Sequence, residues 1–450
     1  MEHTIQQLLR VNIALSQDIF ILDNNSTEKK TIEYLSMSPY KVYYNRKNRG
    51  PWVCPWNNRE LFNLMPKKFI VTDPDLEFHP DLPHNFVEIL SELSDTYLSW
   101  KIGFALDISD TDMMFDGTYV KDRNGKENTI KEWESQFWKR RIEESTHELY
   151  YADIDTTFSM INKEGYKPSI RIAGNFTAKH IPWYKKNKIY NTYEVYVRSL
   201  DSNGVSTISQ RLVSSIEEKY YKIIKKNTFF LIEKNDSDPN ISFWKDIYGD
   251  WERETFDVFD YFLDPKKVFL DIGGWIGTTC MYASRNSKHV YAVEADKKSA
   301  IDLEKNCSIN CDNYTVIHNA IYNIDDIEIS FGKNTHLQDS KLNDSTSQIQ
   351  DSGSALSEGI YHIKTITLPK IIEKYKIDPT NISLIKVDIE GGEEHILEDL
   401  YHFHKTYHVP MYISFHYSWW KNMDIFRFSF LTDEQKQQII QNPFISLVFV

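Results

Sequence analysis

An apolar run followed by a glycine turn occupies residues 268–280, which read VFLDIGGWIGTTC. The run ends in Asp271, as expected where a buried strand reaches the edge of a sheet. Three glycines follow and let the backbone pass close to a ligand before a helical segment begins: Gly273, Gly274 and Gly277. We therefore predict a strand, turn and helix that bind a nucleotide cofactor.

A second apolar segment, residues 288–293, ends in Glu294. Glu294 follows Asp271 by about 20 residues, the spacing at which an acid on the second strand of a βαβ unit accepts hydrogen bonds from ribose hydroxyls. The glycine turn alone is weak evidence, but the two segments together predict a cofactor site.

A third buried strand begins the stretch from Ile382 to Leu397, ISLIKVDIEGGEEHIL, and carries Asp388 and Glu390 to its carboxyl end. Open α/β sheets bind their ligands at that end. The segments DIGGWIG and KVDIEGGE resemble the FkbM family of methyltransferases, whose signatures read DIGANxG and KxDxEGxE. The chain departs from the first signature at Gly274 and Trp275, which puts the local contacts to the methionine end of the cofactor in doubt.

The resemblance implies a Rossmann-like class I methyltransferase that uses S-adenosylmethionine. The methionine end of the cofactor would meet the 271–277 loop, its ribose Glu294, and its adenine the segment that starts with Asn319 and Ala320. Asp388 and Glu390 would lie in the same site, where they bind Mg²⁺ or orient the acceptor. The alternative is a domain of this fold that has no cofactor.

His416 ends the apolar segment 411–415 on the side of the sheet where ligands bind. A hydroxyl acceptor must lose its proton, and histidine is the side chain best suited to accept one near neutral pH. We predict that His416 is the base or a neighbour of a metal ion. A partly buried histidine with a structural role is the alternative.

Length and charge bound the function of the whole chain. The 450 residues suffice for two or three domains, and the net charge of −13 argues against nucleic acid as a partner. No apolar run is long enough to span a membrane, and the N-terminus does not read as a secretion signal, so we expect a soluble protein of the cytoplasm, or of the host cytoplasm if it is viral. The basic run 222–226 is solvated surface or part of an amphipathic helix that contacts a membrane peripherally.

A polar break at residues 233–240 separates two halves. We predict an α/β chain of two domains, residues 1–235 and 236–450. In the second domain strands alternate with helices, which indicates a parallel sheet covered on both faces.

Two segments of the first half end in acids. Within residues 18–26, DIFILDNNS, the apolar residues 19–22 lead to Asp23, which could bind the base or ribose of a nucleotide. Residues 68–71 lead to Asp73 and Asp75, two carboxylates that can share a divalent cation with a diphosphate. A solvated turn is the alternative for this Asp-x-Asp.

The segments ILDNNS (21–26), NRKNRGP (45–51) and the Asp-x-Asp resemble a GT-A glycosyltransferase. The resemblance implies a nucleotide-sugar donor held by Mn²⁺ or Mg²⁺ on Asp73 and Asp75. His180, which precedes Pro182 and Trp183, would be a third metal ligand; otherwise it is a surface histidine. The usual leading strand of that fold has no counterpart in the residues before Asp18, which leaves activity less certain than fold.

An inverting glycosyltransferase needs a carboxylate to accept the proton of the acceptor. Asp107, at the end of the apolar segment 102–106, and Glu134, among aromatic residues, are the two candidates. A helix cap and an exposed helical acid, respectively, are the alternatives.

These observations predict a bifunctional enzyme that transfers a sugar to a glycan acceptor and methylates a sugar hydroxyl, similar to fusions found in glycan-building systems of bacteria and large DNA viruses. One alternative is a methyltransferase whose first half only binds a glycan or nucleotide. Another is a methyltransferase that acts on a lipid or a small metabolite. The sequence assigns no oligomeric state.

Overall fold

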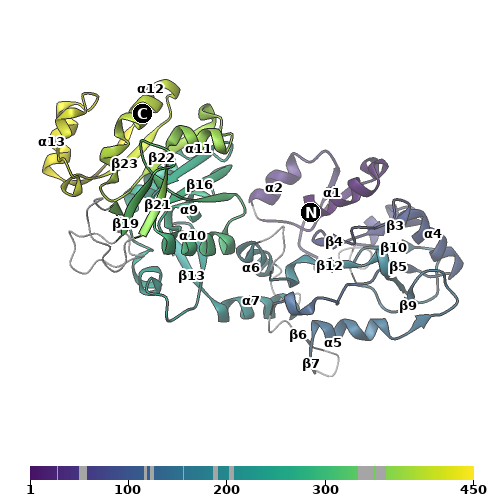
Figure 1. Cartoon of the computed structure of the whole chain (residues 1–450). Coiled ribbons are helices and arrows are strands. Elements are labelled where there is room, and N and C mark those ends of the chain that lie inside the picture. The colour runs from purple at the N-terminus through teal and green to yellow at the C-terminus, as the bar shows by residue number, and fades with distance from the viewer. Residues whose placement is uncertain are drawn as a thin grey trace. The chain divides into compact units, whose positions relative to one another are not determined.

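The computed structural model describes residues 1–27, 29–49, 58–115, 119–121, 126–155, 157–185, 191–201, 207–332, 348–349 and 361–450. The chain forms two compact units (Figure 1). The first unit is Met1–Lys219 and the second is Tyr220–Val450. Gly50 and Pro51 of the quoted NRKNRGP segment lie outside the described residues. Within the described part of the chain, no helix is both long and apolar enough to cross a membrane.

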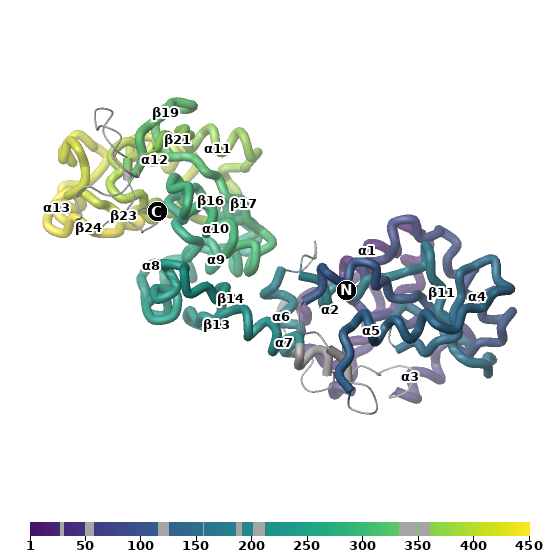
Figure 2. Tube along the Cα trace, turned by 60° about the horizontal axis from the view of Figure 1, so that its bottom comes forward, coloured from purple at the N-terminus to yellow at the C-terminus, as the bar shows by residue number. Residues whose placement is uncertain are grey.

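The division comes before the predicted boundary at residue 235, because a hairpin that precedes the polar break belongs to the second unit. Strands β13 (Tyr220–Lys225) and β14 (Thr228–Glu233) form this hairpin, and Figure 2 follows the chain from it to α8 (Arg253–Phe262). Phe230 of the hairpin packs in one apolar cluster with Phe256 of α8 and Phe269. Burial of these side chains holds the hairpin to the second unit.

The basic run 222–226 is not helical, which corrects the expectation of an amphipathic helix on a membrane. It lies in β13 and the turn after it. Lys225 is buried, donates a hydrogen bond to the carbonyl oxygen of Tyr248 at 3.0 Å and sits 4.1 Å from the ring centroid of Phe256. Lys226 forms ion pairs with Asp257 and Asp260. Because the run lies in a strand and the turn after it, and because the Lys225 side chain is buried, these lysines do not form a basic face of a helix.

A six-stranded sheet forms the centre of the second unit. Its strands are parallel except for the last pair, and their order in the sheet is β17 (Tyr314–His318), β16 (His289–Glu294), β15 (Val268–Ile272), β22 (Ile382–Val387), β23 (Met411–His416) and β24 (Phe444–Phe449). A smaller sheet contains β18 (Ala320–Ile321), β21 (Tyr361–Ile366), β19 (Glu328–Gly332) and β20 (Gln348–Ile349). This unit therefore has the α/β architecture predicted for it.

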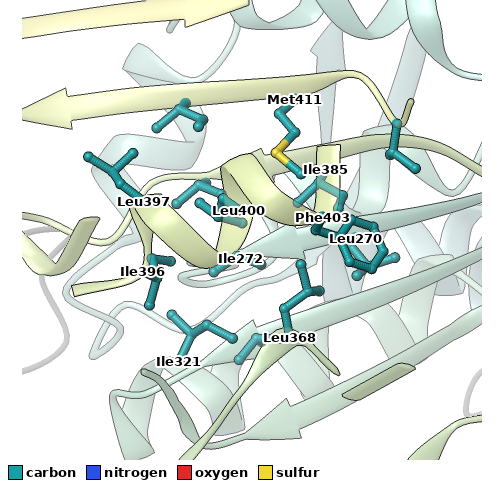
Figure 3. Packing of buried hydrophobic residues seen from close by; sticks show 14 of the residues in the cluster. Leu270, Ile272, Ile321, Leu368, Ile385, Ile396, Leu397, Leu400, Phe403 and Met411 are labelled. Atoms are coloured by element: carbon teal, nitrogen blue, oxygen red, sulfur yellow. The ribbon is translucent and has the colours of Figure 1, made fainter. Parts of the chain in front are cut away.

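Alternate residues of β15 face two apolar layers, as the period of a strand requires. Leu270 and Ile272 pack in a cluster with α11 and α12 (Figure 3), whereas Phe269 packs with α8, α9 and α10. Both faces are thus covered by helices, which explains why β15 is buried along its whole length. The remaining helices of the unit are α9 (Thr278–Ala283), α10 (Lys297–Asn310), α11 (Leu368–Lys374), α12 (Leu397–Tyr407) and α13 (Asp433–Gln441).

The first unit is also α/β. Its largest sheet has mixed strand directions and the order β3 (Lys68–Val71), β10 (Ser159–Asn162), β5 (Lys101–Phe104), β11 (Ile170–Ile172), β9 (Leu149–Tyr151) and β8 (Arg141–Ile142). Three strand pairs accompany it: β1 (Phe20–Asp23) with β2 (Lys41–Tyr44), β4 (Leu76–Phe78) with β12 (Ala178–His180), and β6 (Tyr119–Lys121) with β7 (Glu127–Thr129).

The helices of the first unit are α1 (Glu2–Val11), α2 (Lys29–Ser36), α3 (Arg59–Leu64), α4 (Phe86–Thr96), α5 (Ile130–Ser135), α6 (Thr192–Asp201) and α7 (Thr207–Lys219). Aromatic rings dominate its core, where Phe104 of β5 stacks on Phe158 with 4.5 Å between the ring centroids. The pair of strands β4 and β12 joins two segments that carry predicted site residues.

Truncation of Leu270 to alanine tests the packing of the second unit. Leu270 is fully buried in the middle of β15, so the Leu270→Ala variant should lose about 2–5 kcal/mol of unfolding free energy. Hydrogen exchange of β15 and β22 in urea measures the loss. Ile301→Ala on α10 is the control, since Ile301 is 60% exposed and should change stability by about 0.5 kcal/mol or less. Equal effects of the two substitutions would contradict this packing.

Candidate functional site

A cavity of about 570 Å³ opens at the carboxyl ends of the central strands of the second unit. Its lining includes six residues predicted from the sequence: Gly273, Glu294, Asn319, Asp388, Glu390 and His416. The other predicted cofactor residues, Asp271, Gly274, Gly277 and Ala320, are not part of the cavity wall. The structure thus brings six predicted residues together in one cavity wall, and the remaining four lie outside that wall.

The glycine turn after β15 is required by a close approach of two strands. Gly273 has a φ of +84°, and a Cβ atom there would lie 1.7 Å from the carbonyl oxygen of Asp388. The N–H groups of Gly273 and Gly274 donate to the carbonyl oxygen of Val293 at 2.9 and 3.1 Å. The turn is therefore fixed to the ends of both neighbouring strands, and no side chain fits at Gly273.

Asp271 supports this turn from inside the protein. Its Oδ2 atom accepts a hydrogen bond from Thr279 Oγ1 at 2.6 Å, and its Oδ1 atom lies 3.4 Å from Lys386 Nζ. Lys386 donates to the carbonyl oxygen of Gly273 at 2.8 Å and lies 3.6 Å from Asp388 Oδ2. Burial raises the pKa of Asp271. Burial alone would lower the pKa of Lys386, but Asp271 and Asp388 outweigh it and raise that pKa above its ordinary value.

Lys386 is a site residue that the sequence analysis did not single out, although it begins the quoted KVDIEGGE segment. Its side chain is 3% exposed and lines the cavity. The ammonium group neutralises two carboxylates at once, so it determines where both can lie.

Glu294 closes the neighbouring side of the cavity at the end of β16. Its two carboxylate oxygens each accept a backbone hydrogen bond at 2.7 Å, one from Trp275 and one from Asp296. Burial raises the pKa of Glu294 to about 8 despite these hydrogen bonds. The residue joins the glycine turn to the start of α10 through these two hydrogen bonds, and its predicted contact with ribose hydroxyls stays a prediction.

Three side chains cluster at the same edge of the sheet, on the side of β22 and β23. His416 Nε2 lies 3.3 Å from Glu390 Oε2 and 3.6 Å from Asp388 Oδ1. Among the residues that the structure describes, these three form the group of histidine, cysteine and acidic side chains with the spacing of a metal site. The sequence predicted Asp388 and Glu390 together and His416 from another segment, and the pairing of β22 with β23 brings the two segments together.

Glu393 fixes the imidazole of His416 from behind. Its Oε1 atom lies 2.9 Å from His416 Nδ1, and its Oε2 atom accepts hydrogen bonds from Trp420 Nε1 at 3.1 Å and from the N–H of Gly391 at 3.1 Å. Burial lowers the pKa of His416, but Glu393, Glu390 and Asp388 outweigh it and raise that pKa to about 10. A protonated imidazole at neutral pH weakens the predicted role of His416 as a general base.

Two further features of the cavity had no signal in the sequence analysis. Glu252, from the segment before α8, lines it, and burial together with Asp388 raises the pKa of Glu252 to about 7. Phe444 lines it beside His416 and is 54% exposed, and its ring centroid lies 5.1 Å from that of Trp419. No motif identifies either residue, because each comes from a segment distant in the sequence.

In the first unit, β4 and β12 bring Asp75 and His180 together. Leu76 pairs with His180 in the ladder, and His180 Nε2 lies 3.5 Å from Asp75 Oδ1. Asp73 lies two residues after β3 and is half-buried, and in the described part of the chain it does not complete a group of three metal-ligand side chains with Asp75 and His180. The predicted contact of the Asp-x-Asp with the distant histidine therefore exists for Asp75.

The other predicted acids of the first unit have partners of their own. Asp23 is buried at the end of β1 and accepts a hydrogen bond from the N–H of Ser26 at 3.2 Å. Asp107 accepts from the N–H of Ser109 at 2.8 Å and lies 3.8 Å from Lys179 Nζ. Ser109 lies in a turn and does not begin a helix, so this contact is not the helix cap of the alternative, and Lys179 was not foreseen.

Glu134 forms a buried ion pair instead of facing an acceptor. Its Oε2 atom lies 2.7 Å from Arg171 Nη1, and the two side chains are 4% and 3% exposed. Burial raises the pKa of Glu134, although Arg171 opposes the shift. Neither the predicted base nor the exposed acid of the alternative fits this position, because Arg171 of β11 covers the carboxylate.

Residues 271–437 match the family model of the methyltransferase FkbM domain. The match supports a methyltransferase activity for the second unit, and it begins too late in the chain to support the predicted glycosyltransferase. No curated protein sequence matches the chain.

Several solved structures are similar to parts of the chain. They include methyltransferase FkbM from Methylobacillus flagellatus KT (16% identity, 34% of this chain, 33% of that chain, TM-score 0.23). They also include precorrin 8w decarboxylase from Methanobacterium thermoautotrophicum (13%, 42%, 68%, 0.22) and M. jannaschii TYW2 in complex with AdoMet (13%, 32%, 84%, 0.17). The similarity thus spans a third of the Methylobacillus protein, and at these TM-scores it carries no argument about function.

Replacement of Glu134 by glutamine separates a structural from a catalytic role. Glu134→Gln removes the carboxylate that pairs with the buried charge of Arg171 and should cost about 3–5 kcal/mol of unfolding free energy. Hydrogen exchange of β9 and β11 in urea measures this loss. Glu144→Gln, at an exposed position of the same unit, is the control. A Glu134→Gln variant as stable as the control would return Glu134 to the list of candidate bases.

Proposed function

We propose that the second unit transfers a methyl group from S-adenosylmethionine to a hydroxyl group of a glycan. The observation that carries the proposal is the single cavity that joins Glu294 at one end to Asp388, Glu390 and His416 at the other. The match to the FkbM methyltransferase domain supports the reaction class. Open α/β sheets bind cofactors at this edge of the sheet.

The residues of the cavity fit this cofactor. Its volume of about 570 Å³ falls within the range of ligand sites, roughly 300–1,000 Å³. Glu294 would accept hydrogen bonds from the ribose hydroxyls, the turn at Gly273 would leave room for the methionine end, and Asn319 would lie beside the adenine. When bound, S-adenosylmethionine supplies a methyl group on a positively charged sulfur.

The other end of the cavity suits a polar acceptor. Asp388 and Glu390 offer carboxylate oxygens that can orient a hydroxyl and accept its proton, and orientation supplies most of the catalysis in a methyl transfer. Ser414 and Ser446 line the same region, with their hydroxyl oxygens 2.9 Å apart. Phe444 adds an exposed ring on which a sugar can stack. A lipid acceptor is less compatible with this polar lining.

We also propose, as a second function, that the first unit binds a nucleotide sugar through a divalent cation on Asp75 and His180. The contact between Asp75 and His180 favours this proposal, because it joins an Asp-x-Asp to a histidine from the other end of the unit. A binding module without catalysis is the competing function, and it would use the same residues.

Ionisation of Glu294 should make cofactor binding depend on pH. The pKa of about 8 in the free protein is raised, so the neutral form prevails below pH 8, whereas ribose hydroxyls donate to the charged form. The affinity for S-adenosylhomocysteine should therefore rise with pH up to about 8, by tenfold per unit at most, and then level off. Calorimetric titration between pH 6.5 and 9 measures this dependence.

Glu294→Gln should bind S-adenosylhomocysteine more weakly and lose the part of the pH dependence that Glu294 causes. Glu398→Gln, at an exposed position of α12, is the control and should match the unmodified protein. If neither variant differs from the unmodified protein, Glu294 has no role in binding the cofactor.

Nucleotide-sugar binding tests the second function. Calorimetric titration with UDP- and GDP-sugars in the presence of Mn²⁺ should show binding that weakens by about tenfold or more in Asp75→Asn, the loss usual for damage to a metal site. Asp81→Asn, exposed in the same unit, is the control. Absence of binding to every nucleotide sugar would leave the first unit without this function, and hydrolysis of a bound donor would exclude a purely binding module.

A further inference from the structure

The end of the cavity formed by Asp388, Glu390 and His416 has the arrangement of a metal site. One nitrogen or oxygen atom from each of the three side chains lies within 4.8 Å of the other two. Ligand atoms about 2.0–2.2 Å from a shared ion lie about 3.0–3.5 Å from each other. The distances of His416 Nε2 to Glu390 and Asp388, 3.3 and 3.6 Å, are close to that spacing and longer than ordinary hydrogen bonds.

The imidazole is oriented as in metal sites. Glu393 is fully buried and holds His416 through Nδ1, which leaves Nε2 directed at the two carboxylates. Ligating histidines almost always donate the second ring nitrogen to a carboxylate or carbonyl behind them, and this partner fixes the tautomer that binds the ion. Trp420 and the N–H of Gly391 in turn fix Glu393, so the arrangement does not depend on a mobile side chain.

Glu390 Oε2 makes an ionic contact with His416 Nε2 at 3.3 Å but no hydrogen bond among the residues that the structure describes. This oxygen atom is buried. A buried carboxylate oxygen without a hydrogen bond is costly. The atom faces His416 Nε2, in the direction in which an ion bound by both groups would lie.

Asp388 divides its two oxygens between two partners. Oδ2 lies 3.6 Å from Lys386 Nζ, on the side of the glycine turn, whereas Oδ1 faces His416 Nε2. Lys386 therefore does not occupy the space between the three ligand atoms. The carboxylate can bind an ion through Oδ1 while its other oxygen keeps its contact with the buried ammonium group.

We propose that Asp388, Glu390 and His416 bind one divalent cation of the Mn²⁺ type at the acceptor end of the cavity. One nitrogen and two carboxylate ligands suit first-row divalent metals better than Ca²⁺, which prefers oxygen ligands alone. Three protein ligands leave coordination positions for a substrate. On the proposed methyltransferase function, this favours an acceptor with two neighbouring oxygens, such as a vicinal diol, that can bind the ion together.

The test uses the full chain with the substitution Asp75→Asn, so that the candidate site of the first unit does not contribute. After treatment with a chelator, titration with MnCl₂ is followed by calorimetry and by the electron paramagnetic resonance signal of free Mn²⁺. We expect one ion per chain. Glu390→Gln and His416→Gln should each weaken this binding by about tenfold or more. Glu398→Gln on α12 is the matched control and should not change it.

Binding of S-adenosylhomocysteine shows in the same samples whether each variant remains folded. The inference is overturned if Mn²⁺ does not bind, as expected if a protonated His416 alone neutralises the carboxylates. It is also overturned if Mn²⁺ binds equally well to Glu390→Gln while that variant binds S-adenosylhomocysteine. If the chain without the site substitutions binds S-adenosylhomocysteine but not Mn²⁺, the metal site is excluded and the proposed methyltransferase function is not affected.

Discussion

The ammonium group of Lys386 lies between the carboxylates of Asp271 and Asp388, and the geometry of the second unit's cavity depends on this contact. All three charges are at or near the ends of adjacent strands, and burying them separately would be prohibitively costly. The hydrogen bond from Lys386 to the carbonyl oxygen of Gly273 extends the same network into the glycine turn. The ends of β15 and β22 and the glycine turn are therefore held together by one buried side chain at the base of the cavity.

The cavity contains two different groups of polar side chains. Glu294 sits on the side of β16, where backbone N–H groups hold both its oxygens. Asp388, Glu390 and His416 sit on the side of β23, where a second buried carboxylate, Glu393, sets the orientation of the imidazole.

In the first unit, two predicted acidic site residues have different partners in the structure. Glu134 and Asp75 are both carboxylates in segments rich in apolar residues, yet Arg171 covers the former and His180 of another strand faces the latter. Only the first of these two contacts is a buried ion pair with arginine. The same reasoning applies to Lys225, whose contacts with Tyr248 and Phe256 place a basic residue inside the second unit.

The local sequence was sufficient to locate Gly273, Glu294 and Asp388, because period-two apolar runs fix where a strand ends and which residue follows it. It also indicated the α/β class and the methyltransferase resemblance, which depend on segments of a dozen residues. The tertiary structure decided three other features. Asp271 lies outside the cavity wall, Glu134 pairs with Arg171, 37 residues away, and Glu393 supports His416. Charges that must be neutralised in a buried place find their partners across strands, and a linear pattern does not specify which strands become neighbours.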